Sequence, residues 1–127
     1  MNHNLLKERR VLVVEDEMIV AMMLEDMLEE LGCEVVGPAA GCQQALEIIE
    51  EATPLDAAVL DVNLNGIKSY PVADALTELG VPFAFLTGYE PHSLPNGYRN
   101  LPLLRKPFYL EALRSELESM LTSNAKE

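Results

Sequence analysis

Acidic, hydroxyl and amine side chains each follow directly after a short apolar run in this sequence. The residues in these positions are Glu15, Asp16, Asp61, Thr87 and Lys106. In an open sheet of parallel strands, ligands bind beyond the carboxyl ends of the strands, so side chains placed there gather at one edge. The sequence therefore predicts a single polar site built from three acids, a hydroxyl and a cation.

Three carboxylates at one edge need positive charge nearby. Two carboxylates about 5 Å apart repel by about 3 kcal/mol at an effective dielectric of 20, and Lys106 brings only one charge. We therefore expect a divalent cation, and oxygen ligands of this kind suit Mg²⁺. An aspartate can attack phosphorus and form an acyl phosphate, in a transfer that needs mainly positioning and charge neutralisation. The pattern indicates Mg²⁺-assisted phosphoryl transfer to Asp61.

Each of these residues has an ordinary structural explanation when it is taken alone. Asp16 can cap a helix, Asp61 can open a turn, Thr87 can fill a strand end, and Lys106 can be a solvated surface lysine. The functional interpretation rests on their conjunction at the ends of separate strands.

The elements that must position these residues follow from apolar periodicity. Runs of apolar residues predict strands, and apolar residues three or four apart predict amphipathic helices. The second strand is expected to stop at Gly37-Pro38, and the segment 88–100, with two prolines, is expected to hold only a short or irregular helix. The predicted strands are 11–14, 35–36, 57–60, 83–86 and 101–104, and the predicted helices are 19–31, 45–52, 69–79 and 110–121.

Strands that alternate with helices predict an α/β fold with a parallel sheet covered on both faces.

The chain of 127 residues has room for one domain, and its net charge of -12 argues against binding to nucleic acid or to an anionic membrane surface. Its apolar runs are far shorter than the about 20 residues that a membrane-spanning helix needs. Cys33 and Cys42 fit no metal-binding spacing. We expect a cytoplasmic protein with reduced thiols.

Four motifs together resemble the receiver domain of two-component response regulators. They are Val-Val-Glu-Asp-Glu at 13–17, Leu-Asp-Val-Asn-Leu at 60–64, Leu-Thr-Gly at 86–88 and Lys-Pro at 106–107. The resemblance implies a flavodoxin-like (βα)5 three-layer sandwich whose parallel five-stranded sheet has the order 2-1-3-4-5. It further implies one receiver domain over residues 9–122, with no output domain.

The resemblance also assigns a metal site. It makes Asp61 the phosphoacceptor, and Glu15 and Asp16 the acid pair that holds Mg²⁺ together with Asp61. The backbone carbonyl of Asn63 is implied as a further ligand. The Met-Pro pair that commonly follows the phosphoacceptor in receivers is replaced here by Asn-Leu-Asn-Gly at 63–66.

The response to phosphorylation is assigned to the other two strand ends. The resemblance implies that the Thr87 hydroxyl contacts the phosphoryl group, that Lys106 pairs with a phosphoryl oxygen, and that the bond to Pro107 is cis. Receivers commonly carry an aromatic residue three positions before the lysine, where this sequence has Leu103. Tyr89, or the segment after it, is a candidate to replace that aromatic in coupling, although plain packing explains it as well.

Residues 82–89 resemble a narrower group, the FATGUY-type single-domain receivers of alphaproteobacteria. This resemblance implies a sensor histidine kinase, of the HWE or HisKA_2 class, or a phosphotransfer protein as phosphoryl source. The output would be an unidentified downstream protein or drainage of phosphate from the kinase. By resemblance to receivers, the first helix is expected to dock the kinase. Segment 88–104 and the last helix are expected to form the output face, because a broken helix fits an element of low local stability that phosphorylation can order or shift.

Three alternatives to a phosphorylated receiver keep the same fold. A pseudo-receiver would bind partners without being phosphorylated, and the intact set of acids, hydroxyl and lysine speaks against it. An aspartate-nucleophile phosphatase would need a second acid where Asn63 stands. A flavin or nucleotide binder would need a glycine-rich, anion-binding loop after the first strand, and Glu15 and Asp16 are opposite in charge.

Overall fold

The computed structural model describes residues 5–52, 54–88, 96–98 and 101–125, in which strands and helices alternate along the chain. The elements are β1 (Arg10–Val14), α1 (Met18–Glu30), β2 (Glu34–Ala39), α2 (Cys42–Ala52), β3 (Ala57–Asp61), β4 (Asn63–Leu64), β5 (Ile67–Lys68), α3 (Tyr70–Glu78), β6 (Phe83–Thr87), the 3-10 turn η2 (Asn96–Tyr98), β7 (Leu103–Arg105) and α4 (Leu110–Ala125).

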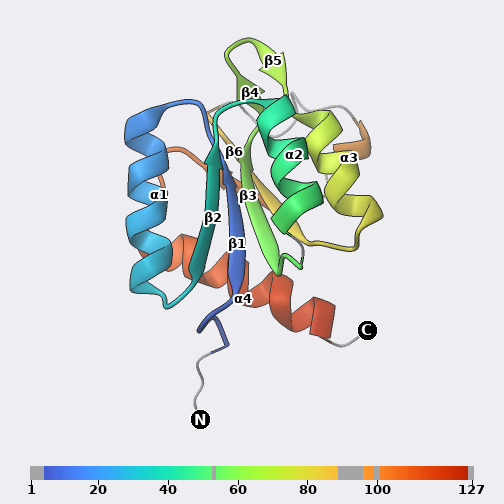
Figure 1. The fold of residues 1–127 in the computed structure, drawn as a ribbon. Coiled ribbons are helices and arrows are strands. Elements are labelled where there is room, and N and C mark those ends of the chain that lie inside the picture. Colours follow the sequence, from blue (N-terminus) through green and yellow to red (C-terminus); the bar gives the residue numbers. More distant parts are fainter. Residues whose placement is uncertain (1–4, 53, 89–95, 99–100, 126–127) are drawn as a thin grey trace.

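Within the described residues, the main sheet has five strands in the order β2-β1-β3-β6-β7. All neighbouring pairs in it are parallel. In chain order this is the predicted arrangement 2-1-3-4-5, so the flavodoxin-like fold is confirmed. Figure 1 shows the carboxyl ends of the strands at the top, where the β4–β5 hairpin projects beyond the sheet.

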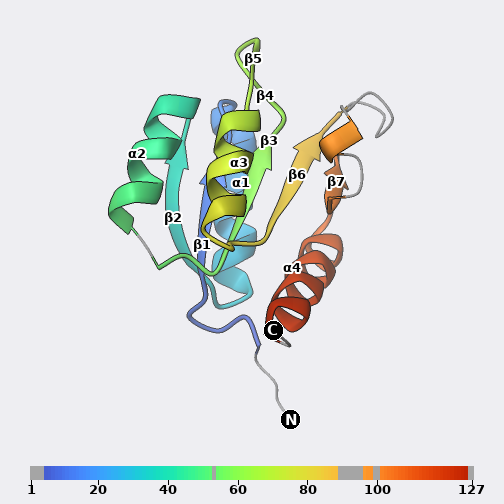
Figure 2. The ribbon, with the colours of Figure 1, turned by 90° about the vertical axis from the view of Figure 1, so that its right-hand side faces the viewer.

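Helices cover the two faces of the sheet (Figure 2), and an apolar core lies between the helices and the sheet on each face. Side chains alternate between faces along a strand, so Val11 and Val13 of β1 join α1 and α4 in one core. Leu12 and Val14 join α2 and α3 in the other. Because β1 lies inside the sheet and is covered on both faces, its continuous apolar run is the expected sequence for it.

The end of β2 differs from the sequence-based expectation. The strand does not stop at Gly37-Pro38 but continues to Ala39, through a cis bond between Gly37 and Pro38. Leu12 faces Val36 and Val14 faces Ala39, so β2 carries one extra residue there as a bulge. Gly37 has φ +95°, and a Cβ on it would lie 3.0 Å from the carbonyl oxygen of Val13, so glycine allows the close approach of the two strands.

The segment after β3 forms an antiparallel hairpin rather than a plain loop. Asn63 pairs with Lys68 and Leu64 with Ile67. Asn65 and Gly66 both have positive φ, 54° and 87°, as in the tight type I′ turns that Asn-Gly favours. The Asn-Gly pair is the sequence signal for this hairpin.

The last strand and the segment before it are the least regular part of the sheet. β7 begins at Leu103, two residues later than predicted, after Pro102, whose ring removes a backbone donor. Of the segment 88–100, residues 89–95 and 99–100 lie outside the described residues, as does Tyr89, and residues 96–98 form η2. No helix in the described ranges combines the length and apolarity needed to cross a membrane.

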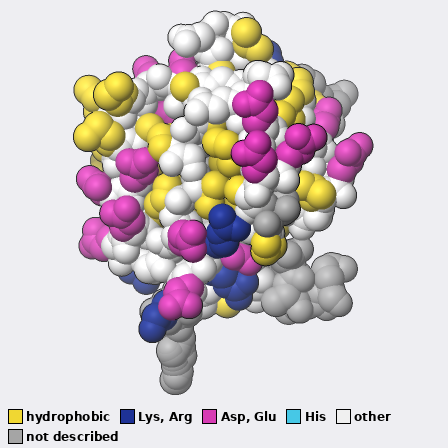
Figure 3. All heavy atoms as spheres, in the orientation of Figure 1, with side chains coloured by type: hydrophobic (Ala, Val, Ile, Leu, Met, Phe, Trp, Pro, Cys, Tyr) yellow, Lys and Arg dark blue, Asp and Glu magenta, His cyan; other side chains and the backbone are white. Residues whose placement is uncertain are grey.

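The amino-terminal part of α1 exposes large apolar side chains. Met18 and Ile19 are each 75% exposed, and Met22 and Met23 are also exposed. Figure 3 shows apolar atoms gathered at the upper left, where α1 begins, with acidic side chains below them. Met18, Met22 and Met23 therefore belong to the surface of this helix, whereas Met27 packs against the core.

Candidate functional site

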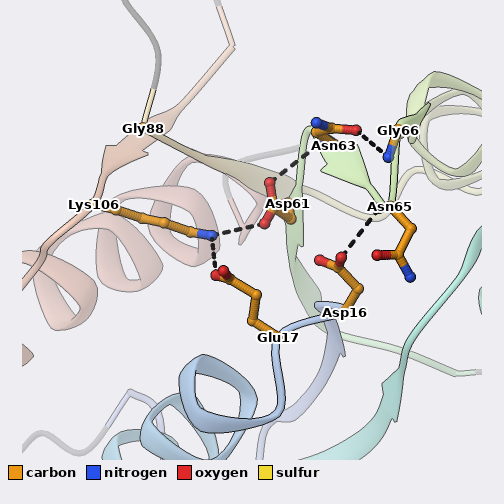
Figure 4. A pocket seen from close by; sticks show the side chains of 8 residues that line it. All are labelled: Asp16, Glu17, Asp61, Asn63, Asn65, Gly66, Gly88 and Lys106. Atoms are coloured by element: carbon orange, nitrogen blue, oxygen red, sulfur yellow. Dashed lines mark hydrogen bonds and ion pairs between the residues drawn. The ribbon is translucent and has the colours of Figure 1, made fainter.

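The polar residues predicted from the sequence lie together at the carboxyl edge of the sheet. Asp61 and Thr87 are the last residues of β3 and β6, Glu15 and Asp16 follow β1, and Lys106 follows β7. An open pocket of about 390 Å³ lies at this edge (Figure 4). It is lined by Asp16, Glu17, Asp61, Asn63, Asn65, Gly66, Gly88 and Lys106.

Three carboxylates form a compact cluster in this site. Glu15, Asp16 and Asp61 each place a carboxylate oxygen within 4.8 Å of the others. Glu15 and Asp61 are buried, with 2% and 7% of their surface exposed, while Asp16 is half-buried at the pocket wall. The proximity that the sequence predicted for these acids is therefore observed.

Lys106 lies among these acids. Its Nζ donates a hydrogen bond to Asp61 Oδ2 at 2.7 Å and lies 3.3 Å from Glu15 Oε1 and 3.4 Å from Glu17 Oε1. Burial alone would lower the pKa of Lys106, but the hydrogen bond to Asp61 and the charges of Asp61 and Glu15 outweigh it and raise the pKa. Lys106 therefore carries a firmly held positive charge beside Asp61.

The surroundings of Glu15 disfavour the charged form of its carboxyl group. Its pKa is raised from the ordinary 4.5 to about 7, and burial is the largest cause. The negative charge of Asp61 raises this pKa further, whereas the hydrogen bond from Glu17 N and the positive charge of Lys106 lower it. Its Oε2 accepts the Glu17 backbone N–H at 3.1 Å. Its Oε1 is buried and accepts no hydrogen bond from any described residue.

The acid cluster fits a divalent cation. A buried carboxylate oxygen without a hydrogen bond is costly unless another positive group meets it, and one lysine cannot balance three carboxylates. Carboxylate oxygens at this spacing are also the hard ligands that Mg²⁺ prefers. The donor set, and a buried Glu15 Oε1 that has only the Lys106 ammonium at 3.3 Å beside it, together match such an ion.

Backbone amides of the β4–β5 hairpin contact two of these acids. Asn63 N donates to Asp61 Oδ1 at 3.1 Å, and Asn65 N donates to Asp16 Oδ2 at 3.1 Å. The Asn63 side chain turns back to the hairpin, where its Oδ1 accepts the Gly66 N–H at 2.9 Å. Figure 4 shows these bonds linking the hairpin to the acids.

Thr87 and the Lys-Pro pair are at the expected strand ends. Thr87 is buried at 2% exposure, behind the pocket rather than on its wall, where Gly88 stands. Its carbonyl accepts the Lys106 N–H at 2.9 Å. The bond between Lys106 and Pro107 is cis, which confirms that part of the resemblance. Leu103 is half-buried against the core on the α2–α3 face.

Three residues of the site were missed from the sequence. Glu17 contacts Lys106, and Asn65 contacts Asp16. Ser69 is fully buried and its hydroxyl donates to the Asp61 carbonyl at 2.6 Å. The sequence placed Ser69 only at a helix start. These contacts carry no local signal, because each joins segments that the fold brings together.

An aromatic cluster lies behind the strand that ends in Thr87. Tyr70 and Tyr98 stack with ring centroids 4.4 Å apart and an interplanar angle of 12°. Phe85 of β6 meets both rings edge-on. The Tyr98 hydroxyl donates to Asp74 Oδ1 at 2.9 Å. These contacts attach η2 to α3 and to β6 two residues before Thr87.

Comparisons with known proteins agree with this geometry. Residues 11–118 match the family model described as response regulator receiver domain. The transcriptional regulatory protein PdtaR of Mycobacterium tuberculosis is 32% identical over 114 residues, which are 87% of this chain and 55% of PdtaR. The phyllosphere-induced regulator PhyR of Methylorubrum extorquens is 35% identical over 104 residues, 77% of this chain and 38% of PhyR. The chain thus spans about half or less of the length of these two relatives.

Solved structures show the same relationship in three dimensions. The solution structure of SdrG from Sphingomonas melonis Fr1 superposes with a TM-score of 0.80 at 42% identity, covering 95% of this chain and 99% of that one. The response regulator PhyR from Brucella abortus gives a TM-score of 0.83 at 29% identity, covering 97% of this chain and 52% of that one.

Proposed function

The chain belongs to the receiver domain family of response regulators, and on that premise we propose that Asp61 accepts a phosphoryl group from a phosphohistidine. The observation that carries the proposal is the 2.7 Å contact between Lys106 Nζ and Asp61 Oδ2 inside an acid cluster. Residues 9–122 would form the receiver unit. The chain would act as a phosphoacceptor that catalyses its own phosphotransfer and slow dephosphorylation, and not as a turnover enzyme.

The transfer step uses Asp61 as nucleophile. A carboxylate oxygen of Asp61 forms a bond to phosphorus while the phosphorus–nitrogen bond of the phosphohistidine breaks, and the departing imidazole nitrogen keeps the electron pair. Lys106, which donates a hydrogen bond to Asp61 Oδ2, neutralises phosphoryl oxygen charge during the attack. Asn63 N, already bonded to Asp61 Oδ1, holds the carboxylate in one orientation.

Glu15, Asp16 and Asp61 would hold Mg²⁺, with the backbone carbonyl of Asn63 as a further ligand. When bound, the ion supplies charge neutralisation for the phosphoryl oxygens. Support comes from the spacing of the carboxylates and from the buried Oε1 of Glu15.

Thr87 would carry the response. The phosphoryl group carries nearly two negative charges, while the Asp61 carboxylate loses its own charge on forming the acyl phosphate. The Thr87 hydroxyl, at the end of the neighbouring strand, is the proposed group that turns toward the phosphoryl oxygens. The result would pass through changed binding to a downstream protein, or the phosphate would drain from the kinase. A cytoplasmic location is part of the proposal and agrees with Cys33 and Cys42, both of which are free thiols.

Docking of the phosphoryl source is proposed at the amino-terminal end of α1. Its exposed apolar side chains, Met18, Ile19 and Met22, stand next to the loop that carries Asp16. A sensor histidine kinase of the HWE or HisKA_2 class, or a phosphotransfer protein, would present its phosphohistidine there. The described part of segment 88–104 and α4 is the proposed output face.

Acetyl phosphate with Mg²⁺ tests the proposal directly. The intact mass should show one added phosphoryl group on the wild-type protein, and Asp61→Asn should show none. Ser119→Ala, on the exposed face of α4, serves as a matched control and should be phosphorylated like the wild type. If the wild type binds Mg²⁺ but gains no mass, the chain is a pseudo-receiver. If it instead releases phosphate continuously from a monoester, it is a phosphatase.

A further inference from the structure

The β4–β5 hairpin (Asn63–Lys68) stands where receivers commonly carry Met-Pro after the phosphoacceptor, and its role is open. It contacts the two acids that come from different strands, Asp16 after β1 and Asp61 at the end of β3 (Figure 4). This segment connects β3 to α3 in the chain, and its contacts with both acids also affect the geometry of the site.

The hairpin holds both acids through its backbone. One end binds Asp61 through Asn63 N, and the tip binds Asp16 through Asn65 N, each at 3.1 Å. A backbone N–H donor that points at a carboxylate oxygen fixes the direction in which the remaining lone pairs face. The distance between the two carboxylates therefore depends on the shape of the hairpin.

That shape depends on the turn at its tip. Asn65 and Gly66 are both left-handed, and the Gly66 N–H is fixed by the Asn63 side chain. A Cβ placed on Gly66 would meet no atom within 4 Å. An alanine there would cause no clash, so its effect would come from backbone conformation alone, which disfavours φ +87° for a residue with a Cβ.

We propose that the β4–β5 hairpin is a positioning element for the metal site, in which the Asn65 N–H and the left-handed turn at Gly66 hold Asp16 and Asp61 at the separation that Mg²⁺ requires. The inference rests on the proposed function, because it takes these acids as the Mg²⁺ ligands. Neither Asn65 nor Gly66 touches the reacting atoms; both act through the acids.

Gly66→Ala tests the proposal, with Gly80→Ala as its matched control. Gly80 also has a positive φ, +73°, and open surroundings, but it follows α3, which ends at Glu78, away from the hairpin. Both substitutions therefore introduce the same kind of backbone strain. We expect Gly66→Ala to raise the Mg²⁺ dissociation constant, measured by calorimetry, by about three- to tenfold, since only the turn-competent fraction binds.

Gly80→Ala should lower thermal stability to a similar extent and leave the Mg²⁺ dissociation constant within about twofold of the wild type, as expected for strain remote from the ligands. Gly66→Asn is the rescue variant, because asparagine tolerates positive φ better than alanine. It should bind Mg²⁺ more tightly than Gly66→Ala. Hydrogen exchange of the Asn65 amide should be faster in Gly66→Ala, as its bond to Asp16 opens.

Two results would overturn the inference while leaving the proposed function intact. One is wild-type Mg²⁺ affinity in Gly66→Ala, and the other is an equal loss of affinity in Gly80→Ala. If the wild type itself bound no Mg²⁺, the proposed function would fail, and the inference with it.

Discussion

Glu15 is the residue whose chemistry depends most on the fold. In the sequence it is one acid of a pair beside Asp16, but the structure buries it and leaves Asp16 at the pocket wall. Burial and the charge of Asp61 raise the pKa of Glu15 to about 7. Glu15 therefore takes up a proton near neutral pH when no Mg²⁺ is bound.

This protonation predicts a pH dependence of Mg²⁺ binding. The ion needs the ionised carboxylate, so Glu15 must lose its proton first, and affinity should rise with pH through about 7. In calorimetric titrations at fixed ionic strength, we expect the Mg²⁺ dissociation constant to be about tenfold larger at pH 6 than at pH 8.

The controls separate Glu15 from its neighbours. Glu15→Gln should bind more weakly at pH 8 and lose most of the pH dependence, whereas Asp16→Asn should weaken binding at both pH values. A full pH dependence that persisted in Glu15→Gln would show that another group is responsible.

At the scale of elements, helix α4 packs against β7 and holds it in place. Leu113 and Leu117 of α4 are fully buried in the same core as Leu104 of β7. Because Lys106 follows β7, the packing of α4 fixes the strand end from which this lysine reaches Asp61. The stability of the core and the geometry of the site are linked through this helix.

Leu117→Ala should lower the free energy of unfolding by about 3 kcal/mol, the usual cost of removing a fully buried leucine side chain. Urea denaturation at pH 8 measures this change. Ser119→Ala, exposed on the same helix, should change it by no more than about 0.5 kcal/mol. Equal costs for the two variants would contradict the assignment of Leu117 to the core.

The turn η2 depends on Tyr98 for its attachment to α3. Tyr98→Phe keeps the ring stack on Tyr70 and removes the hydrogen bond to Asp74. It should lower the free energy of unfolding by about 0.5 kcal/mol, as for a solvent-accessible hydrogen bond. Tyr98→Leu, which also removes the stack, should cost at least about 0.5 kcal/mol more.

Urea denaturation again provides the measurement, with Tyr109→Phe as the control because Tyr109 is 75% exposed. Tyr109→Phe should leave stability unchanged. If Tyr98→Leu were as stable as the wild type, the aromatic stack would contribute nothing to holding η2.

For the whole molecule, the net charge of -12 and the acid cluster both destabilise the folded state. Repulsion among like charges destabilises the compact state, and the three carboxylates at the sheet edge add to this repulsion locally. A cation bound only by the folded protein stabilises it by mass action. Mg²⁺ should therefore do more than screen charge.

At pH 8, Mg²⁺ at about 100 times its dissociation constant should raise the free energy of unfolding by about 2.7 kcal/mol. NaCl at matched ionic strength should give a smaller increase, through screening alone. In Asp16→Asn the two salts should act nearly alike. Chemical denaturation in each salt distinguishes a specific site from general screening, and equal stabilisation of the wild type by both would count against the site.

Much of the fold was predictable because its signals are local. Continuous apolar runs marked the strands, helical periodicity marked the helices, and their alternation with the family motifs gave the sheet order. The edge position of Glu15, Asp61 and Lys106 followed from that order, since parallel strands end on the same side. The differences between prediction and structure are also local: β2 continues past Gly37-Pro38 to Ala39, and β7 begins at Leu103 and not at Leu101.

Local sequence determined which residue types reach the carboxyl edge of the sheet, and only the tertiary structure decided what surrounds each of them there. Asn65 meets Asp16 across 49 positions of sequence, and Lys106 meets Asp61 across 45. Such contacts, and the burial of Glu15, depend on how separate segments approach in space. Apolar periodicity indicates which side chains of a segment face the core. It does not specify which individual residue of another segment each side chain contacts.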